Sequence, residues 1–112
     1  MTTTPLLRVE PPRYEHHRRP LGIGEPAPRL SWTVVTDLPG WVQRGYEIEI
    51  ADVAGARRTA TGLVESDRSV LVPWPGADLR SRERCGVRVR VHGGDGSASG
   101  WSPWSWAETG LL

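Results

Sequence analysis

Alternation of apolar and charged residues is clearest in the stretch Val87-Arg88-Val89-Arg90-Val91. A period of two places the valines on one face of a β-strand and the arginines on the other. The same alternation recurs in Tyr46-Glu47-Ile48-Glu49-Ile50 and in Leu30-Ser31-Trp32-Thr33-Val34. Each stretch therefore predicts a strand with one buried face. We expect a core that contains Trp32, Tyr46, Ile48, Ile50, Val87, Val89 and Val91.

Shorter stretches of the same kind raise the number of predicted strands to seven. They are residues 6–9, 57–61, 69–72 and 105–109. Turn-forming residues separate the strands at 37–40, 52–55, 73–76 and 93–96. This pattern predicts an all-β fold, a seven-stranded antiparallel β-sandwich with Greek-key connections. The proline-rich residues 11–28 are predicted to be irregular and to cross from one sheet to the other.

Charges on two of these strands predict how the strands pair. In a sandwich of this order the third and sixth strands are neighbours in one sheet, so Glu47 and Glu49 would face Arg88 and Arg90. Cross-strand pairs of opposite charge contribute about 0.2–1 kcal/mol each, so they fix the register more than they stabilise the fold. We interpret this face as solvated rather than as a binding site.

Size and composition place the 112 residues in a single domain, residues 1–112, with a modest core. The formal net charge of +1 does not favour nucleic acid or an anionic membrane as a partner. The one cysteine, Cys85, cannot form an intramolecular disulfide, which excludes a disulfide-framed secreted module. We see neither a leader-like N-terminus nor a run of about 20 apolar residues. We therefore expect a soluble protein, and the sequence leaves its compartment open.

The sequence shows no pattern for catalysis, a cofactor or a metal. A glycosidase needs two carboxylates about 5–9.5 Å apart in a cleft, but the 13 acidic residues are scattered over turns and strand exteriors. Adjacent His16 and His17 point to opposite sides of an extended chain and cannot chelate one metal together, and His92 lies far along the chain. Cys85 shares the inward parity of the valines in 87–91, which predicts a buried structural thiol rather than a nucleophile.

Three of the six tryptophans lie within the stretch Gly100-Trp101-Ser102-Pro103-Trp104-Ser105-Trp106-Ala107-Glu108-Thr109. Residues 101–105 are similar to the WSxWS box that precedes the last strand of a fibronectin-III domain in cytokine receptors, although the paired cysteines of those receptors are missing. In that box, tryptophan rings alternate with guanidiniums from the neighbouring strand. We therefore predict a ladder of cation–π contacts, about 0.5–1 kcal/mol each, that braces the last two strands. Its predicted members are Trp101, Trp104, Arg84, Arg88 and Arg90.

Two further uses of the tryptophans stay open. Ring faces that the arginines leave bare could anchor a following domain or could bind carbohydrate. The candidates for such interdomain or sugar contacts are Trp41, Trp74 and Trp106. Trp41 and Trp74 lie beside predicted turns, where half-buried anchors of the loops are the commoner arrangement.

An ordered set of stretches resembles the fibronectin-III/immunoglobulin-like domain at the N-terminus of bacterial α-L-rhamnosidases of glycoside hydrolase family 78. The stretches are residues 7–10, 20–23, 28–32, 43–48, 62–66, 79–82 and 95–112. The resemblance implies a non-catalytic accessory domain of an enzyme that hydrolyses terminal α-L-rhamnose, with the catalytic carboxylates in a separate (α/α)₆ barrel that this chain lacks. It also implies that 110–112 is a domain boundary, and that the partners are other domains of the same polypeptide.

This chain departs from the family pattern at two places. Residues 59–62 replace the usual Trp-Asp-Ser/Thr-Gly segment, and Cys85 stands where sandwich domains often carry the tyrosine of a tyrosine corner. Loss of that tyrosine's hydrogen bond would cost on the order of 1 kcal/mol. Two alternatives to the accessory domain are a carbohydrate-binding module and a free-standing adhesion or receptor-like domain, because one sandwich fold serves many functions.

Overall fold

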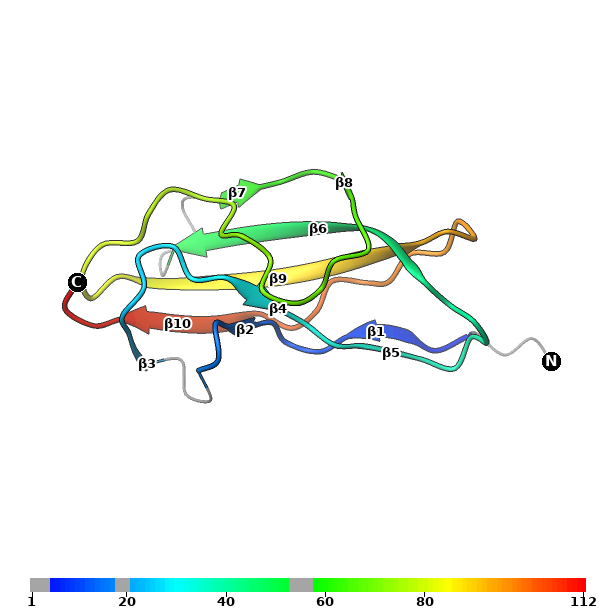
Figure 1. Ribbon diagram of the computed structural model, residues 1–112, viewed down its shortest axis with the longest axis horizontal. Coiled ribbons are helices and arrows are strands. Elements are labelled where there is room, and N and C mark those ends of the chain that lie inside the picture. The colour runs from blue at the N-terminus through cyan, green and yellow to red at the C-terminus, as the bar shows by residue number, and fades with distance from the viewer. Residues whose placement is uncertain (1–4, 18–20, 53–57) are drawn as a thin grey trace.

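Two ten-residue strands, β6 (Gln43–Asp52) and β9 (Arg84–Gly93), form the centre of the fold in the computed structural model, which describes residues 5–17, 21–52 and 58–112 (Figure 1). They pair antiparallel, with Ile48 opposite Val89 on the inner face. On the outer face Glu47 lies opposite Arg90 and Glu49 opposite Arg88. The alternation and the register of the charges are thus confirmed.

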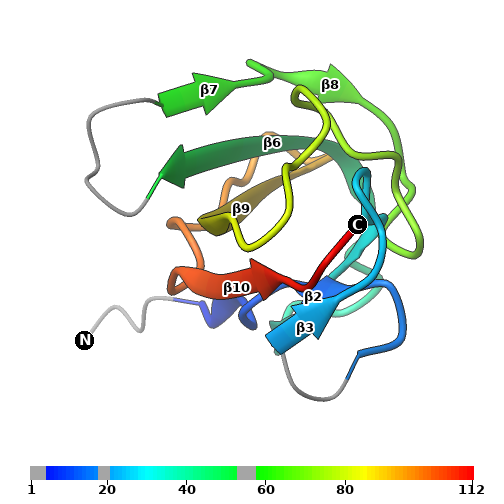
Figure 2. The ribbon, with the colours of Figure 1, turned by 90° about the vertical axis from the view of Figure 1, so that its left-hand side faces the viewer.

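The central pair belongs to a larger sheet with the order β3-β10-β9-β6-β7, in which β8 also pairs with β6. Its other strands are β3 (Leu21–Ile23), β7 (Arg58–Ala60), β8 (Val64–Glu65) and β10 (Ser105–Thr109). β3 runs parallel to β10, whereas the other pairs are antiparallel. Figure 2 shows how the sheet curves from β7 through β9 to β10 and β3.

Two short strand pairs cover the inner face of this sheet. One joins β1 (Leu7–Val9) to β5 (Val34–Thr36), and the other joins β2 (Arg13–Tyr14) to β4 (Leu30–Ser31). The described residues contain these ten strands in place of the seven predicted from the sequence. The predicted sandwich is confirmed, but its second layer is more broken than the alternation indicated.

The predicted strand 30–34 is split in two. Trp32 lies between β4 and β5, and its backbone N–H donates to the carbonyl of Ser69 at 2.9 Å rather than to a neighbouring strand. The predicted strand 69–72 is reduced to one bridge between Val72 and Leu30, because Leu71 has a φ of 50° that bends the chain.

The segment 11–28 is not wholly irregular, since β2 and β3 lie within it. β2 pairs with β4 in one layer and β3 pairs with β10 in the other. Residues 18–20 and the predicted turn residues 53–55 lie outside the described residues.

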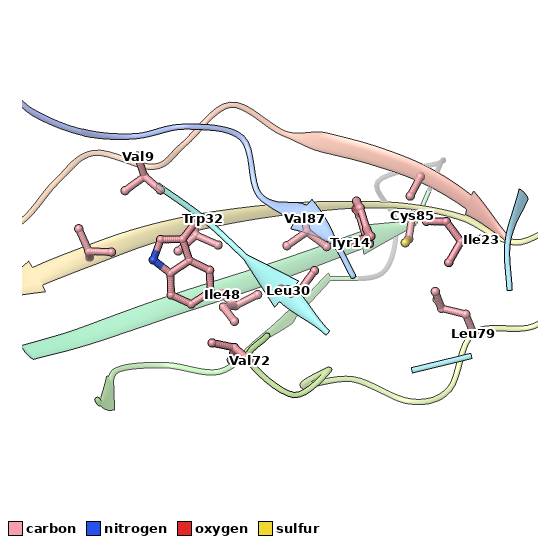
Figure 3. Packing of buried hydrophobic residues seen from close by; sticks show 13 residues of the cluster. Val9, Tyr14, Ile23, Leu30, Trp32, Ile48, Val72, Leu79, Cys85 and Val87 are labelled. Carbon is pink, nitrogen blue, oxygen red and sulfur yellow. The ribbon is translucent and has the colours of Figure 1, made fainter. Parts of the chain in front are cut away.

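The core lies between the two layers (Figure 3). Of the seven expected core residues, Trp32, Ile48 and the three valines of β9 are buried. Tyr46 and Ile50 are half-buried and pack against them. Leu30 and Cys85 are buried as the alternation indicated. Further buried side chains come from β1, β2, β3 and the loops: Val9, Tyr14, Ile23, Val72 and Leu79.

Candidate functional site, an arginine–tryptophan ladder

The start of the tryptophan cluster lies beside the C-terminal half of β9, because β10 is short and pairs only with the N-terminal half. Ser105, the first residue of β10, pairs with Val87, so the residues before it run along the rest of β9. The backbone N–H of Ser102 donates to the carbonyl of Val89 at 2.8 Å, and that of Ser99 donates to Val91 at 2.9 Å. This segment therefore lies beside Arg88 and Arg90, two of the outward-pointing arginines of β9.

Rings and guanidiniums alternate along this face. The guanidinium carbon of Arg88 lies 4.6 Å from the ring centroid of Trp101 and 4.6 Å from that of Trp104. The guanidinium carbon of Arg90 lies 4.6 Å from the Trp101 ring. We call these four residues the arginine–tryptophan ladder. The guanidinium carbon of Arg58, on β7, lies 5.7 Å from the Trp104 ring and flanks it.

Carboxylates from β6 hold the two guanidiniums in place. Glu49 accepts hydrogen bonds of 2.8 and 3.2 Å from Arg88. Glu47 accepts hydrogen bonds of 2.5 and 3.1 Å from Arg90. The Nε2 atom of His92 lies 2.7 Å from the same carboxylate. The Arg90 hydrogen bonds hold the pKa of Glu47 below its usual value, against the opposing effect of burial. The ladder is thus fixed from both sides.

Arg88 is the more enclosed of the two arginines, with its side chain 23% exposed against 37% for Arg90. Its Nε is buried and has no hydrogen-bond partner among the described residues. Its NH2 group donates to Glu49, while two tryptophan rings lie within cation–π distance of the guanidinium. Partial desolvation of this kind strengthens a cation–π contact relative to a fully exposed one.

Arg84 is not a member of the ladder, which corrects the sequence prediction. Among the described residues, the guanidiniums over these rings come from Arg88, Arg90 and Arg58. Arg84 has the right parity but lies at the opposite end of β9, where it pairs with Glu108 of β10. The parity of a strand sets the face on which a side chain lies, but not its level along the strand.

Trp106 rests on a glycine rather than on an arginine. It pairs with Gly86, and a Cβ atom at Gly86 would lie 2.9–3.0 Å from three atoms of the Trp106 ring. The rings of Trp106 and Trp104 are 5.9 Å apart and tilted by 32°. Trp106 is 40% exposed, and no guanidinium of the described residues lies over it. Of the three clustered rings, it is therefore the one whose outer face is bare.

The structure places Trp41 and Trp74 as half-buried anchors of loops. The indole N–H of Trp41 donates to the Ser97 hydroxyl at 2.8 Å, and that of Trp74 donates to the Ala77 carbonyl at 2.9 Å. The Trp74 ring also contacts Tyr14, with 6.4 Å between ring centroids. Both indoles thus have structural partners.

Two serines that the sequence interpretation did not single out complete the edge of β9. The hydroxyls of Ser102 and Ser99 accept hydrogen bonds of 2.9 Å from the backbone N–H groups of Val89 and Val91. Each serine thus binds β9 through both its backbone and its side chain. The first serine of the Trp-Ser-Pro-Trp-Ser motif, Ser102, could have indicated this bond, since a hydroxyl can replace a strand carbonyl as acceptor.

Replacing Ser102 with alanine is expected to lower the free energy of unfolding by about 1–3 kcal/mol, because the buried N–H of Val89 loses an acceptor. Urea denaturation followed by circular dichroism measures the change. The matched control is Ser105→Ala, since the Ser105 hydroxyl makes no hydrogen bond within the described residues. The control is expected to stay within about 0.5 kcal/mol, and equal losses in the two variants would contradict the role of Ser102.

Cys85 is a buried thiol beneath this site, as its parity predicted. It packs in the core with Tyr14, whose hydroxyl donates to the carbonyl of Ser105 at 2.6 Å. Tyr14, from β2, thus provides a hydroxyl-to-backbone bond beside the position where the family comparison suggested a lost tyrosine. Burial raises the pKa of the Cys85 thiol to about 11, and burial also raises the pKa of Tyr14.

The raised pKa of Cys85 predicts a loss of stability at alkaline pH. A thiol with its ordinary pKa of 9.0 ionises in the unfolded chain before the native thiol, with its pKa of about 11, does so. The contribution of the protonated Cys85 thiol to the free energy of unfolding is therefore complete below pH 9.0. It is lost as the pH rises to about 11. Urea denaturation at a series of pH values measures the decline, which should be smaller in Cys85→Ser. An identical decline in both proteins would contradict the assignment to Cys85.

Two of the three histidines lie within hydrogen-bond distance of a carboxylate. His17 lies 2.9 Å from Glu25, and His92 is bound to Glu47 as described. Within residues 5–17, 21–52 and 58–112, no group of three or more His, Cys, Asp or Glu side chains could hold a metal ion. In the same ranges, no helix has the length and apolar character needed to cross a membrane.

The fold and the ladder together define an immunoglobulin-like β-sandwich domain whose last strands are braced by stacked arginine and tryptophan. Residues 9–112 match the family described as Rha78A-like, N-terminal immunoglobulin domain. The chain belongs to this family of N-terminal domains and is itself a non-catalytic domain.

Relatives of known structure share this fold. The chain is 44% identical over 110 residues to an α-L-rhamnosidase of Streptomyces avermitilis and spans 95% of its own length but 11% of that protein. The crystal structure of the Streptomyces avermitilis enzyme with L-rhamnose matches 94% of this chain and 11% of that one, with a TM-score of 0.85. A rhamnosidase structure from Aspergillus terreus matches with a TM-score of 0.88 and 44% identity, over 96% of this chain and 12% of that one.

Proposed function

We propose that this chain is the accessory N-terminal domain of a larger α-L-rhamnosidase, where it packs against neighbouring domains and supports them. The observation that carries the proposal is the domain-sized match, since nearly all of this chain aligns with about a tenth of the Streptomyces avermitilis enzyme. The contacts of the site support a structural role, because its arginines and tryptophans are engaged with one another and with β6. In this proposal, hydrolysis takes place in another domain of the parent polypeptide.

Assays of the parent polypeptide and of the isolated residues 1–112 test the proposal. With an aryl α-L-rhamnoside as substrate, we expect hydrolysis by the parent and none by the isolated chain. A parent polypeptide without rhamnosidase activity would overturn the assignment to this enzyme class. Hydrolysis by the isolated chain would overturn the accessory role.

Carbohydrate binding is a second candidate function, favoured by a groove of about 590 Å³ beside Trp74 at the end of the sandwich. Thr59, Asp78 and Arg80 also line the groove and offer polar groups to a sugar. Calorimetric titration of the isolated chain with L-rhamnose tests this function, with Trp74→Ala as the comparison. Saturable binding that is lost in the variant would establish a carbohydrate-binding module, and no heat of binding at millimolar sugar would exclude it.

A further inference from the structure

The outer face of β10 carries the one bare ring of the tryptophan cluster. Trp106 is seated on Gly86 and against Trp104, so its position is fixed although it is 40% exposed. A pre-positioned aromatic ring loses little conformational freedom when a partner covers it. Tryptophan is enriched among the residues that contribute most of the binding energy at protein interfaces.

An exposed leucine on the neighbouring strand extends this face. Leu21 of β3 is 68% exposed and lies opposite Glu108. Glu108 is two residues beyond Trp106, so Leu21 lies on the same side of the sheet as Trp106. Figure 2 shows β3 beside β10. We call Trp106 and Leu21 the docking face.

The last residues of the chain are fixed beside the docking face. The backbone N–H of Gly110 donates to the carbonyl of Ile23 at 2.9 Å, and that of Leu112 donates to the hydroxyl of Ser81 at 2.8 Å. A segment that continues from this point would leave from beside Ile23, which is two residues along β3 from Leu21. A partner tethered at such a short distance would cover the face at little cost in loop-closure entropy.

We infer that the docking face binds an apolar surface of the domain that follows in the parent polypeptide, an inference that rests on the proposed function. The family is an N-terminal domain, and the part of the Streptomyces avermitilis enzyme that aligns with it is 11% of that protein. Most of such a polypeptide therefore follows the domain, and it leaves from beside the docking face. Burial of one tryptophan and one leucine supplies the hydrophobic contact.

Hydroxyl-radical footprinting with mass spectrometry tests the inference, since it reports the exposure of single side chains. We expect Trp106 and Leu21 to be oxidised severalfold more slowly in the parent polypeptide than in the isolated 112-residue chain. Val70, which is 61% exposed on another part of the molecule, is the matched control and should react equally in both. Equal oxidation of Trp106 and Leu21 in the two proteins would overturn the inference.

A double variant, Leu21→Ser with Trp106→Ser, tests the contact by its effect on the parent. In scanning calorimetry we expect this domain to unfold separately from its neighbour in the variant, whereas Val70→Ser leaves the transition unchanged. A dimer of the isolated chain that Trp106→Ser abolishes, together with an unprotected face in the parent, would assign the face to a second copy instead. A parent that hydrolyses rhamnosides but leaves the face exposed overturns this inference and not the proposed function. A parent polypeptide with a protected face and no rhamnosidase activity overturns the proposed enzyme class and leaves the contact at the docking face standing.

Discussion

Replacing Trp32 with alanine is expected to lower the free energy of unfolding by about 3–5 kcal/mol, the usual cost of deleting a buried aromatic side chain. Trp32 is 2% exposed, and its ring meets that of Tyr46 edge to face at 5.1 Å. Its indole N–H donates to Gln43 Oε1 at 3.2 Å. The variant therefore loses apolar contacts and leaves a buried amide oxygen without its donor.

The effect of Trp32 extends to the loop after β8. The amide nitrogen of Gln43 donates to the carbonyls of Ser66 and Arg68 at 3.1 and 2.9 Å. Trp32 thus orients a side chain that ties this loop to β6. Because small domains have only about 5–15 kcal/mol of stability, Trp32→Phe is the safer companion variant. It keeps a ring and should cost about 1–3 kcal/mol for the lost donor.

Urea denaturation of both Trp32 variants, followed by far-ultraviolet circular dichroism, measures these losses. A cost below about 1 kcal/mol for Trp32→Ala, with an unchanged dependence on urea concentration, would contradict the central position of this ring. If Trp32→Phe is as stable as the unsubstituted 112-residue chain, the hydrogen bond from Trp32 to Gln43 is dispensable for stability.

Replacing Arg88 with alanine is expected to lower the free energy of unfolding by about 2–4 kcal/mol, because partly desolvated cation–π contacts contribute up to about 2 kcal/mol each and two are lost. The change also leaves Glu49 without its guanidinium partner at 2.8 Å, and Glu49 is 15% exposed. Arg88→Lys keeps the charge but not the planar group that stacks on two rings, so it should recover only part of the loss.

Arg84→Ala is the matched control for the Arg88 variants, because Arg84 lies on the same strand and the same face but outside the ladder. We expect Arg84→Ala to change the free energy of unfolding by about 0.5 kcal/mol or less. Thermal and urea denaturation of the three variants provide the comparison. Equal losses for Arg84→Ala and Arg88→Ala would show that charge on this face, and not stacking, stabilises the domain.

The strands with strict alternation could be predicted from the sequence, and the broken ones could not. In 46–50 and 87–91 the period of two and the opposed charges specify both the strands and their register. The stretch 30–34 shows the same period, yet Trp32 binds the backbone of Ser69, which is distant in sequence. Local patterns do not report such long-range bonds, so the split between β4 and β5 could not be foreseen.

The ladder could be predicted in kind but not in all its members. The motif at 101–105 and the arginines of β9 indicated stacking, while the level of each arginine along the strand depends on where β10 begins. Arg84 was assigned wrongly for that reason, and Arg58 was missed because it comes from β7. Gly86 carried a readable signal, since a glycine within an alternating strand marks a close approach of another group.

A double-mutant cycle between Arg88 and Trp104 tests the central claim, that stacking of arginine on tryptophan braces the last strands, most directly. The guanidinium carbon and the ring centroid are 4.6 Å apart. We predict that Arg88→Ala and Trp104→Ala each destabilise the domain, and that the double variant loses less than the sum of the two by about 0.5–3 kcal/mol. Additivity within about 0.3–0.5 kcal/mol, the behaviour of independent sites, would contradict the ladder.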